Sequence, residues 1–542
     1  MNTSRAIVLA TTLAWTAASA QSGGPFVNFR IFPSTVAQTE PVVVVHPTDP
    51  LRMFASGRTI RINPIFQSEG VYVTTNGGTT WFGSDFCSGR DTLNHGGDPG
   101  LAIRLDGRLI LTHIGDPNIS SGMFSHYSTN LGASWSIAAQ IFHSTNQPPD
   151  DRGEATAIDN NPASPFYGKT YIAWAILGSP FSVFTSNSTD GAQTWSAPVI
   201  INPSNPANCS GAFTRIGNNG EVYICWAGLT AFPFNEDFVG FAASTNGGTT
   251  WRVSQNAFDM NGIRGTLPSK GGIRVDGLPK LAVDKSGGPR SGWIYIVTTE
   301  KNLAPAGSDP DIILHHSTDD GLTWSAATRV NQDPLSNGKT QYFPAIDVDY
   351  TGGINIIFND DRNTTADSSE IMLARSVDGG TTWREWVISD HRFQPTPILG
   401  GPAGYQGDHI AITSVGNKLY PLWMDDFTGV YQIWTAPIDI TTLAVENGTN
   451  EIPNSFSLKQ NYPNPFNPST TIEYTVDKTD FVTLRVLDIT GREIARLVNE
   501  RQSPGTHRAT FNAGRFKLSS GIYYYQLFSH GHFETKAMAL IK

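Results

Sequence analysis

The sequence predicts an all-β protein built mainly from one repeated unit. Only 15% of its 542 residues are charged, below the usual value of about 25%, whereas 53 glycines, 34 prolines and 11% aromatic residues suit short strands joined by tight turns. Short runs with alternating apolar and polar residues recur along the chain. An eight-residue motif, STNGGTTW at residues 244–251, has five further variants. Together these features favour repeated antiparallel sheets.

The repeated unit contains four predicted strands. In the third copy they cover residues 153–159, 169–175, 181–188 and 194–200, and the motif is the turn between the third and fourth strands. The tryptophans that end the six motifs lie at positions 81, 135, 195, 251, 324 and 383. Four antiparallel strands repeated at a period of about 55 to 75 residues predict a β-propeller.

Each position of the motif has a predicted role in the turn. The Asn or Asp at its third position can accept hydrogen bonds from turn amides, and a nearby Gly supplies a positive φ. The Trp is expected to pack between neighbouring sheets, with its N–H bonded to a carbonyl. The structural residues predicted in this way are Asn76, Trp81, Asn130, Trp135, Asp190, Trp195, Asn246, Trp251, Asp319, Trp324, Asp378 and Trp383.

The motif resembles the Asp box, SxDxGxTW, of sialidase-like propellers with BNR repeats. The resemblance extends over residues 26–440, with Ala192 in place of Gly and Ser134 in place of Thr as small departures. A seventh unit without a box follows at residues 407–438, and the strand at 26–34 can complete it from the other end of the chain. We therefore predict seven blades, with the six blades of known sialidases as the alternative.

The C-terminal part has a different composition. After a predicted linker at 441–455, residues 456–542 contain NYPNPFNPSTTIEYTV and alternating strands with turns at Thr490-Gly491 and Ser520-Gly521, which predict a small Ig-like β-sandwich. This order of segments resembles the type A C-terminal sorting domain of the type IX secretion system. The resemblance implies export by that machinery in a Gram-negative bacterium of the Bacteroidetes or their relatives, usually with removal of the tail and release or surface attachment. A generic Ig-like adhesion domain is the alternative.

Other features of the sequence address compartment and partners. Residues 1–20, with Arg5, an apolar stretch and the ending Ala18-Ser19-Ala20, predict a secretory signal peptide. No other segment has the roughly 18 consecutive apolar residues of a transmembrane helix. The net charge of −10 without a basic patch argues against nucleic acid as a partner. Of three cysteines, Cys209 and Cys225 can pair in an oxidising compartment, although sequence does not fix connectivity.

The resemblance to sialidase-like propellers implies that the functional face is the one opposite the motif turns. On that face the first strand of each unit begins and the second ends, and the candidate site residues lie there. They are Arg58, Asp98, His113, Asp116, Arg152, Glu154, Tyr342, Asp360, Asp361, Arg362, Asp408, Asp425 and Asp426. Arg and Asp residues at such positions also commonly pair with each other in purely structural networks. The acidic residues suit Ca²⁺ by ligand type, but their spacing is unlike an EF-hand, and no cofactor is expected.

Resemblance to sialidases implies three arginines that clamp a carboxylate, a Tyr nucleophile with a Glu, and an Asp acid/base. Arg58, Arg152 and Arg362 can form the clamp, with Glu154 beside Tyr342 or Tyr405, and Asp361 completes the predicted catalytic set.

Residues 29–32, FRIF, also resemble the FRIP sequence that carries the first clamp arginine in sialidases, yet the closure argument places Arg30 on an outermost strand. Two functions follow: a surface or secreted propeller that binds a glycan or protein through its central funnel, or a glycoside hydrolase that removes terminal acidic sugars. Because the Asp box indicates a fold and not an activity, it does not distinguish between these two functions.

Overall fold

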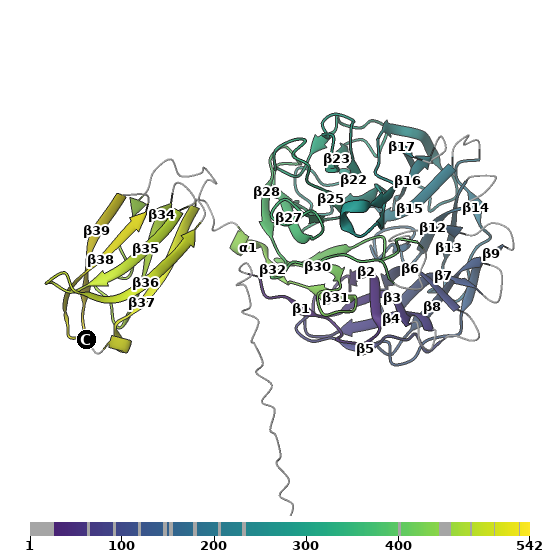
Figure 1. The fold of residues 1–542 in the computed structure, drawn as a ribbon. Helices are drawn as coiled ribbons and strands as arrows, with labels where there is room; N and C mark the ends of the chain where they lie inside the picture. Colours follow the sequence, from purple (N-terminus) through teal and green to yellow (C-terminus); the bar gives the residue numbers. More distant parts are fainter. Residues whose placement is uncertain are drawn as a thin grey trace, which may run out of the picture. The chain divides into compact units, whose positions relative to one another are not determined.

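The protein divides into two compact units, Met1–Ile440 and Thr441–Lys542, in the computed structural model (Figure 1). The structure describes residues 26–61, 66–89, 94–116, 121–144, 149–150, 156–176, 182–203, 208–229, 235–398, 403–443, 457–476, 480–502, 505–516, 518–529 and 532–542. The predicted signal peptide and most of the predicted linker lie outside these residues. Two 3-10 turns and the short helix α1 (Ile440–Leu443) are the helical elements among the described residues, which confirms the all-β prediction.

Within the described residues, the first unit contains seven antiparallel sheets of four or five strands and one hairpin (Figure 1). The first three sheets are β2 (Ala37–Val45), β3 (Met53–Arg61), β4 (Phe66–Thr74) and β5 (Phe82–Ser84); β6 (Asn94–Ile103), β7 (Leu109–Asp116), β8 (Ser121–Ser128) and β9 (Ala139–Ser144); and β10 (Pro149–Asp150), β11 (Thr156–Ile158), β12 (Thr170–Ile176), β13 (Val183–Ser188) and β14 (Val199–Ile200).

The remaining sheets follow the same order of strands. They are β15 (Asn208–Ile216), β16 (Val222–Leu229), β17 (Glu236–Ser244) and β18 (Arg252–Asp259); β21 (Lys280–Val283), β22 (Ile294–Glu300), β23 (Asp311–Ser317) and β24 (Thr328–Arg329); β25 (Gln341–Val348), β26 (Ile354–Asp360), β27 (Glu370–Ser376) and β28 (Arg384–Val387); and β29 (Ala411–Val415), β30 (Lys418–Asp425) and β31 (Gln432–Thr435) with β1 (Phe29–Arg30) and β32 (Ile438–Asp439). The hairpin is β19 (Gly265–Leu267), η1 (Pro268–Lys270) and β20 (Ile273–Val275).

The seven sheets form a closed ring (Figure 1). The strand β2 contacts β6, β6 contacts β11, β11 contacts β15, β15 contacts β21, β21 contacts β25, β25 contacts β29, and β29 contacts β2. Each of these strands pairs only with the second long strand of its sheet, at the side away from the fourth strand, so they line the axis. The fourth strands lie at the periphery, since each pairs only with the third strand.

The two ends of the first unit meet in one sheet. Strand β1 pairs antiparallel with β31, with Phe29 opposite Thr435 and Arg30 opposite Trp434. Ile31 donates its backbone N–H to Ile433 at 3.0 Å, and its side chain is buried with Val43 and Tyr420. β1 therefore covers the open edge of β31. Arg30 lies on this outermost strand, with its guanidinium carbon 5.8 Å from the Trp434 ring, as the closure argument expects.

The six motif turns share one hydrogen-bond pattern. The side-chain oxygen at the third position accepts the backbone N–H four residues later at 2.9–3.0 Å in every copy. For example, Thr80 N–H donates to Asn76 Oδ1, and Thr323 N–H donates to Asp319 Oδ1. The first-position hydroxyl accepts a further amide at 2.8–3.1 Å. In three turns the acceptor is a carboxylate, and these hydrogen bonds hold the pKa of Asp319 down at about 2 despite weak burial.

Each motif tryptophan packs in a core between its own sheet and the preceding one. Trp135 contacts the cluster that contains Phe54 and Leu111, and Trp324 contacts the cluster that contains Phe241 and Leu281. The carbonyl partner expected for the indole N–H is not found among the described residues. Trp195 donates instead to the Ser125 hydroxyl of the preceding sheet at 2.8 Å. Packing, rather than a shared indole hydrogen bond, therefore joins the sheets.

All three cysteines are buried free thiols. Cys209 lies opposite Gly228 and Cys225 lies opposite Phe213, so the two thiols are not cross-strand partners. The disulfide considered from the sequence is therefore absent. Burial raises the pKa of Cys225 to about 12, which keeps this thiol protonated and unreactive.

The second unit consists of two antiparallel sheets around its own core. One contains β33 (Ser457–Leu458), β34 (Ser469–Val476) and β37 (Gly505–Asn512), followed by the 3-10 turn η2 (Ala513–Phe516), and the other contains β35 (Asp480–Leu487), β36 (Glu493–Gln502), β38 (Gly521–Ser529) and β39 (His532–Leu540). Leu484 and Tyr525 from one sheet and Tyr474 and Phe511 from the other share one hydrophobic cluster. Among the described residues, no helix has the length and apolar character needed to cross a membrane.

The closure of the ring makes a prediction about Ile31. Replacing Ile31 with Ala should lower the free energy of unfolding by about 2–5 kcal/mol, because it removes a buried side chain and loosens β1. Val27→Ala is the control, since Val27 is 78% exposed. Urea unfolding followed by intrinsic fluorescence measures both. Equal midpoints for the two variants would show that β1 does not hold the ring closed.

Candidate functional site

Backbone bulges shape one end of the ring. Register shifts interrupt the pairing of β2, β6, β15 and β25 with their second strands, and at these bulges Glu40, Asp98, Gly211 and Phe343 have positive φ values of 55°, 54°, 66° and 52°. Non-glycine residues adopt such angles rarely, and bulges redirect side chains near functional sites. Thr39 pairs with Arg58, and Arg58 pairs with Glu69, so these residues lie at the end opposite the motif turns.

Tyr405 is the centre of a buried polar cluster at this end. Its hydroxyl donates to Glu40 Oε1 at 2.7 Å and lies 3.1 Å from Thr39 Oγ1. The guanidinium carbons of Arg58 and Arg274 lie 4.8 and 5.4 Å from the centroid of the Tyr405 ring. The electron-rich face of the phenol ring attracts both cations. The arrangement thus joins a phenol, a carboxylate and two arginines.

Four carboxylates surround the same point. Glu40 Oε2 accepts the N–H of Asp98, and Glu69 Oε1 accepts the N–H of Gly97, both at 3.1 Å. Asp408 forms a two-pronged ion pair with Arg274, with Nε to Oδ1 at 3.0 Å. Oxygen atoms of Glu40, Asp98 and Asp408 lie within 4.8 Å of one another. A β-carbon at position 97 would meet Arg58 Cδ at 2.7 Å, so Gly97 is needed to let the arginine approach.

Burial determines the charges in the cluster. It raises the pKa of Glu40, helped by Asp408 and opposed by Arg58 and the Tyr405 hydrogen bond. Burial and then the Glu40 charge raise the pKa of Glu69 well above its usual value. The pKa of Tyr405 is also well above 10, first through burial and then through Glu40, so the phenol is protonated at neutral pH. Arg58 forms no ion pair with an acid in the part of the chain that the structure describes.

An inserted hairpin brings Arg274 to this cluster. The Arg274 backbone N–H donates to the Gly404 carbonyl at 2.7 Å, next to Tyr405. The other end of the hairpin is held by Lys270, whose Nζ lies 2.8 Å from Asp361 Oδ2 and donates to the carbonyls of Ala366 and Ser368 at 3.0 Å. Lys270 and Asp361 are both almost fully buried. The hairpin therefore connects the loop after β26 with the loop before β29.

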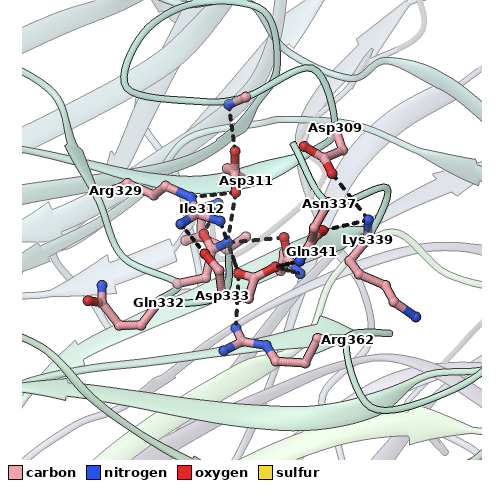
Figure 2. A network of polar contacts seen from close by, with 12 residues as sticks. Asp309, Asp311, Ile312, Arg329, Gln332, Asp333, Asn337, Lys339, Gln341 and Arg362 are labelled. Carbon is pink, nitrogen blue, oxygen red and sulfur yellow. Dashed lines mark hydrogen bonds and ion pairs between the residues drawn. The ribbon is translucent and has the colours of Figure 1, made fainter. Parts of the chain in front are cut away.

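Three of the six residues predicted as catalytic have other partners. Asp361 holds Lys270, and the Tyr342 hydroxyl lies 3.0 Å from Ser369 Oγ. Arg362 bonds Asp360 and Glu385 at 2.6–2.9 Å. Figure 2 shows Arg362 pointing toward Asp333 in a network that also contains Arg329 and Asp311, with Arg362 and Asp333 3.7 Å apart. Arg362 is thus neutralised by acids of neighbouring strands and does not share a partner with Arg58.

The other predicted residues are distributed around the ring. Arg152 and Glu154 lie outside the described residues, and Asp116 ends β7. Asp425 accepts the Trp423 indole N–H at 2.8 Å and lies 3.0 Å from His391 Nε2, and Asp426 accepts Thr396 Oγ1. Of the predicted residues, the structure brings Arg58, Tyr405, Asp98 and Asp408 together. His113 belongs to a different cluster.

Sequence reasoning missed Glu40, Glu69 and Arg274. Glu40 had a usable signal, because the pairs Glu40-Pro41 and Asp98-Pro99 occupy the same position, at the bulge of the first strand, in consecutive sheets. No pattern in the sequence marked Arg274, because it lies in the inserted hairpin and comes close to Tyr405 only when the chain is folded. Near the axis, a cavity of about 10 Å³ lined by residues such as Phe213, Lys280 and His409 has room for a single water molecule.

Comparisons with known proteins identify the C-terminal unit. Residues 460–541 match the family model described as the secretion system C-terminal sorting domain, which confirms that prediction. The match indicates a protein that the type IX secretion system exports to the cell surface or the medium in Bacteroidetes, and it implies contact with that machinery. No curated protein sequence matches the chain.

A comparison with solved structures found distant similarities. The chain is 14% identical to a Hadza microbial sialidase over 72% of this chain and 76% of that one, with a TM-score of 0.39. It is 10% identical to an ulvan lyase over 76% and 97% of the two chains, with a TM-score of 0.45. It is 11% identical to PorZ, a surface component of the type IX secretion system of Porphyromonas gingivalis, over 91% and 69%, with a TM-score of 0.32.

The buried ion pair of the hairpin makes a second prediction. Asp361→Asn should cost about 3–5 kcal/mol locally, because it leaves the Lys270 ammonium buried without its counter-ion. We expect faster proteolytic cleavage within residues 265–275, measured by mass spectrometry. The double variant Lys270→Met with Asp361→Leu should restore resistance, since it removes both charges. Unchanged cleavage in Asp361→Asn would mean that the ion pair does not anchor the hairpin.

Proposed function

We propose that the chain is an exported, seven-bladed, sialidase-like β-propeller with a small Ig-like sorting domain, and that it binds an acidic glycan at the Tyr405 cluster. The observation that supports this proposal most directly is the position of Arg58. Its guanidinium lies against the Tyr405 ring with Gln67 as its hydrogen-bonding partner at 3.2 Å and with no acid paired to it in the described part of the chain. An arginine held in this way is suited to the carboxylate or sulfate group of a sugar.

The acids of the cluster are compatible with an acidic ligand. Burial favours the neutral forms of Glu40 and Glu69, and Asp408 is already paired with Arg274. Among the described residues, Glu40 and Asp98 act on Arg58 through their charges, but neither forms an ion pair with it. The carboxylates and Thr39 can hydrogen-bond sugar hydroxyls, and the aromatic ring supplies apolar contact. Ca²⁺ is less well suited, since Arg58 and Arg274 lie next to the same oxygens.

A second candidate function is glycoside hydrolysis at the same site. The hydrogen bond of 2.7 Å from the Tyr405 hydroxyl to Glu40 pairs a nucleophile with a base. This reaction needs the ionised form of Glu40, which Arg58 and the Tyr405 hydrogen bond favour against burial. Glu40 would accept the phenol proton while Tyr405 attacks the anomeric carbon, and Asp98 would protonate the leaving oxygen. Water would then attack the anomeric carbon and give a proton to Asp98, while the Tyr405 oxygen leaves and takes its proton back from Glu40. The signal peptide, the sorting domain and removal of the tail complete the proposed route to the surface or the medium.

Binding can be tested with variants of the two arginines. The full chain should bind a sialylated trisaccharide more tightly than its neutral counterpart in isothermal titration calorimetry. Arg58→Ala and Arg274→Ala should each weaken this binding about 10- to 100-fold, the loss expected for a charge-assisted hydrogen bond worth about 1.5–3 kcal/mol. Arg384→Ala is the matched control, since Arg384 is an exposed residue of the outermost strand β28. Equal affinities for both sugars, or equal effects of all three variants, would contradict the proposal.

Catalysis is separated from binding by Tyr405→Phe. With a fluorogenic sialoside, this variant should lose essentially all hydrolysis and keep its affinity within about threefold, because it removes only the hydroxyl. If the unmodified protein binds the sialoside but does not hydrolyse it, then glycoside hydrolysis is excluded for that sugar and the binding function still stands.

A further inference from the structure

Three histidines meet in the sheet formed by β6–β9, away from the Tyr405 cluster. His95 lies on β6, His113 on β7 and His126 on β8. His95 pairs with Gly115, two residues from His113, and His126 pairs with Leu111, two residues from His113 on the other side. Since side chains two residues apart share a face of a strand, the three imidazoles form a diagonal row on one face. All three are fully buried, with 0% exposure.

The row faces the core between this sheet and the preceding one. Leu111, directly opposite His126, belongs to the hydrophobic cluster that also contains Val71, Val73 and Cys87. One ring nitrogen of each histidine lies within 4.8 Å of those of the other two. Polar groups buried in an apolar core need partners, so three stacked imidazoles there require an explanation.

Two histidines of the row have Nδ1 contacts with backbone carbonyls, which is the arrangement common among metal-binding histidines. The Nδ1 atoms of His113 and His126 lie 2.8 and 2.9 Å from the backbone carbonyls of Ile114 and Ser136. A histidine whose Nδ1–H donates to a carbonyl presents the Nε2 lone pair to a metal. His113 Nε2 has no hydrogen-bonding partner among the described residues. Burial, and then His95 and His126, lower the pKa of His113 well below its usual value, so its ring is neutral.

An internal comparison shows what is specific to this row. His315 occupies the position of His126 in the sheet formed by β21–β24, and its Nδ1 lies 2.9 Å from the Ser325 carbonyl in the same way. Its ring stacks on Phe258 at 3.9 Å, whereas the ring of His113 stacks on His95 at 3.9 Å and lies 5.2 Å from that of His126. The carbonyl contact is therefore a feature of the repeat, and the two additional histidines are not.

We propose that His95, His113 and His126 bind one divalent transition-metal ion, Zn²⁺ by ligand type. Three imidazole ligands suit zinc and leave the fourth position of a tetrahedral ion for a water molecule or small anion. The lone pair of an imidazole nitrogen lies in the plane of its ring, and the three rings are nearly parallel. Binding of one ion by all three nitrogens therefore requires the rings to tilt toward it. The metal then joins β6, β7 and β8 on the face that packs against the neighbouring sheet.

The test uses the full chain, loaded with ZnCl₂ and dialysed against metal-free buffer. Elemental analysis should find about one zinc ion per chain in the unmodified protein and in His315→Gln, and less than about a tenth of that in His113→Gln. Zinc should raise the unfolding temperature of the first two proteins and not of the third. Zinc retained equally by His113→Gln, or by none of the proteins, would overturn the proposal.

A spectroscopic measurement keeps the test decisive if His113→Gln fails to fold. Co²⁺ in place of Zn²⁺ should give the visible d–d bands of a tetrahedral nitrogen site in the unmodified protein and in His315→Gln, and ZnCl₂ should displace them. A spectrum identical to that of free Co²⁺ would exclude the site without any reference to the variant.

Discussion

Pairing of β1 with β31 is the contact on which the first unit depends, because it joins residues about 400 positions apart and completes the last sheet. Without it, β31 would present an unpaired edge, and the sheets would have an open end. Ile31 adds a buried apolar contact to the backbone pairing. Among the described residues, motif tryptophans pack at six of the seven junctions between sheets, and Trp81 packs at the junction between the last sheet and the first. The last sheet takes its outermost strand from the other end of the unit.

Closure also creates the Tyr405 cluster. Glu40 and Tyr405 are 365 residues apart in the chain, and their side chains are hydrogen-bonded because β2 and β29 are neighbours in the closed ring. The positive φ at Glu40 and Asp98 turns both side chains away from regular strand geometry toward this point. Arg274 arrives from a third direction on its anchored hairpin. The geometry of the cluster is therefore a property of the ring, and loosening the ring should disperse its charges.

The repeat made the sheets and turns predictable, because hydrogen bonding at Asn76 or Asp319 depends on residues within four positions. The sorting domain was predictable for a similar reason, from a local order of strands and turns. The site was predictable only in part. Arg58, Asp98 and Asp408 were found from their place in the repeat, but Arg274 reaches Tyr405 through an insertion. Arg362 and Asp361 looked like site residues because sequence does not reveal Glu385 or Lys270 as their partners.

Disulfide trapping tests the closed ring most directly. Cysteines introduced in place of Phe29 and Thr435 would lie directly opposite each other, and the roughly 5.5 Å between such α-carbons suits a disulfide. Under mild oxidation, peptide mass spectrometry should find the 29–435 bridge within single chains, and little bridging when the second cysteine replaces Asp439 instead. If the 29–435 pair stays reduced, or links only different chains, then β1 does not complete the sheet of β31 and the account of the ring is wrong.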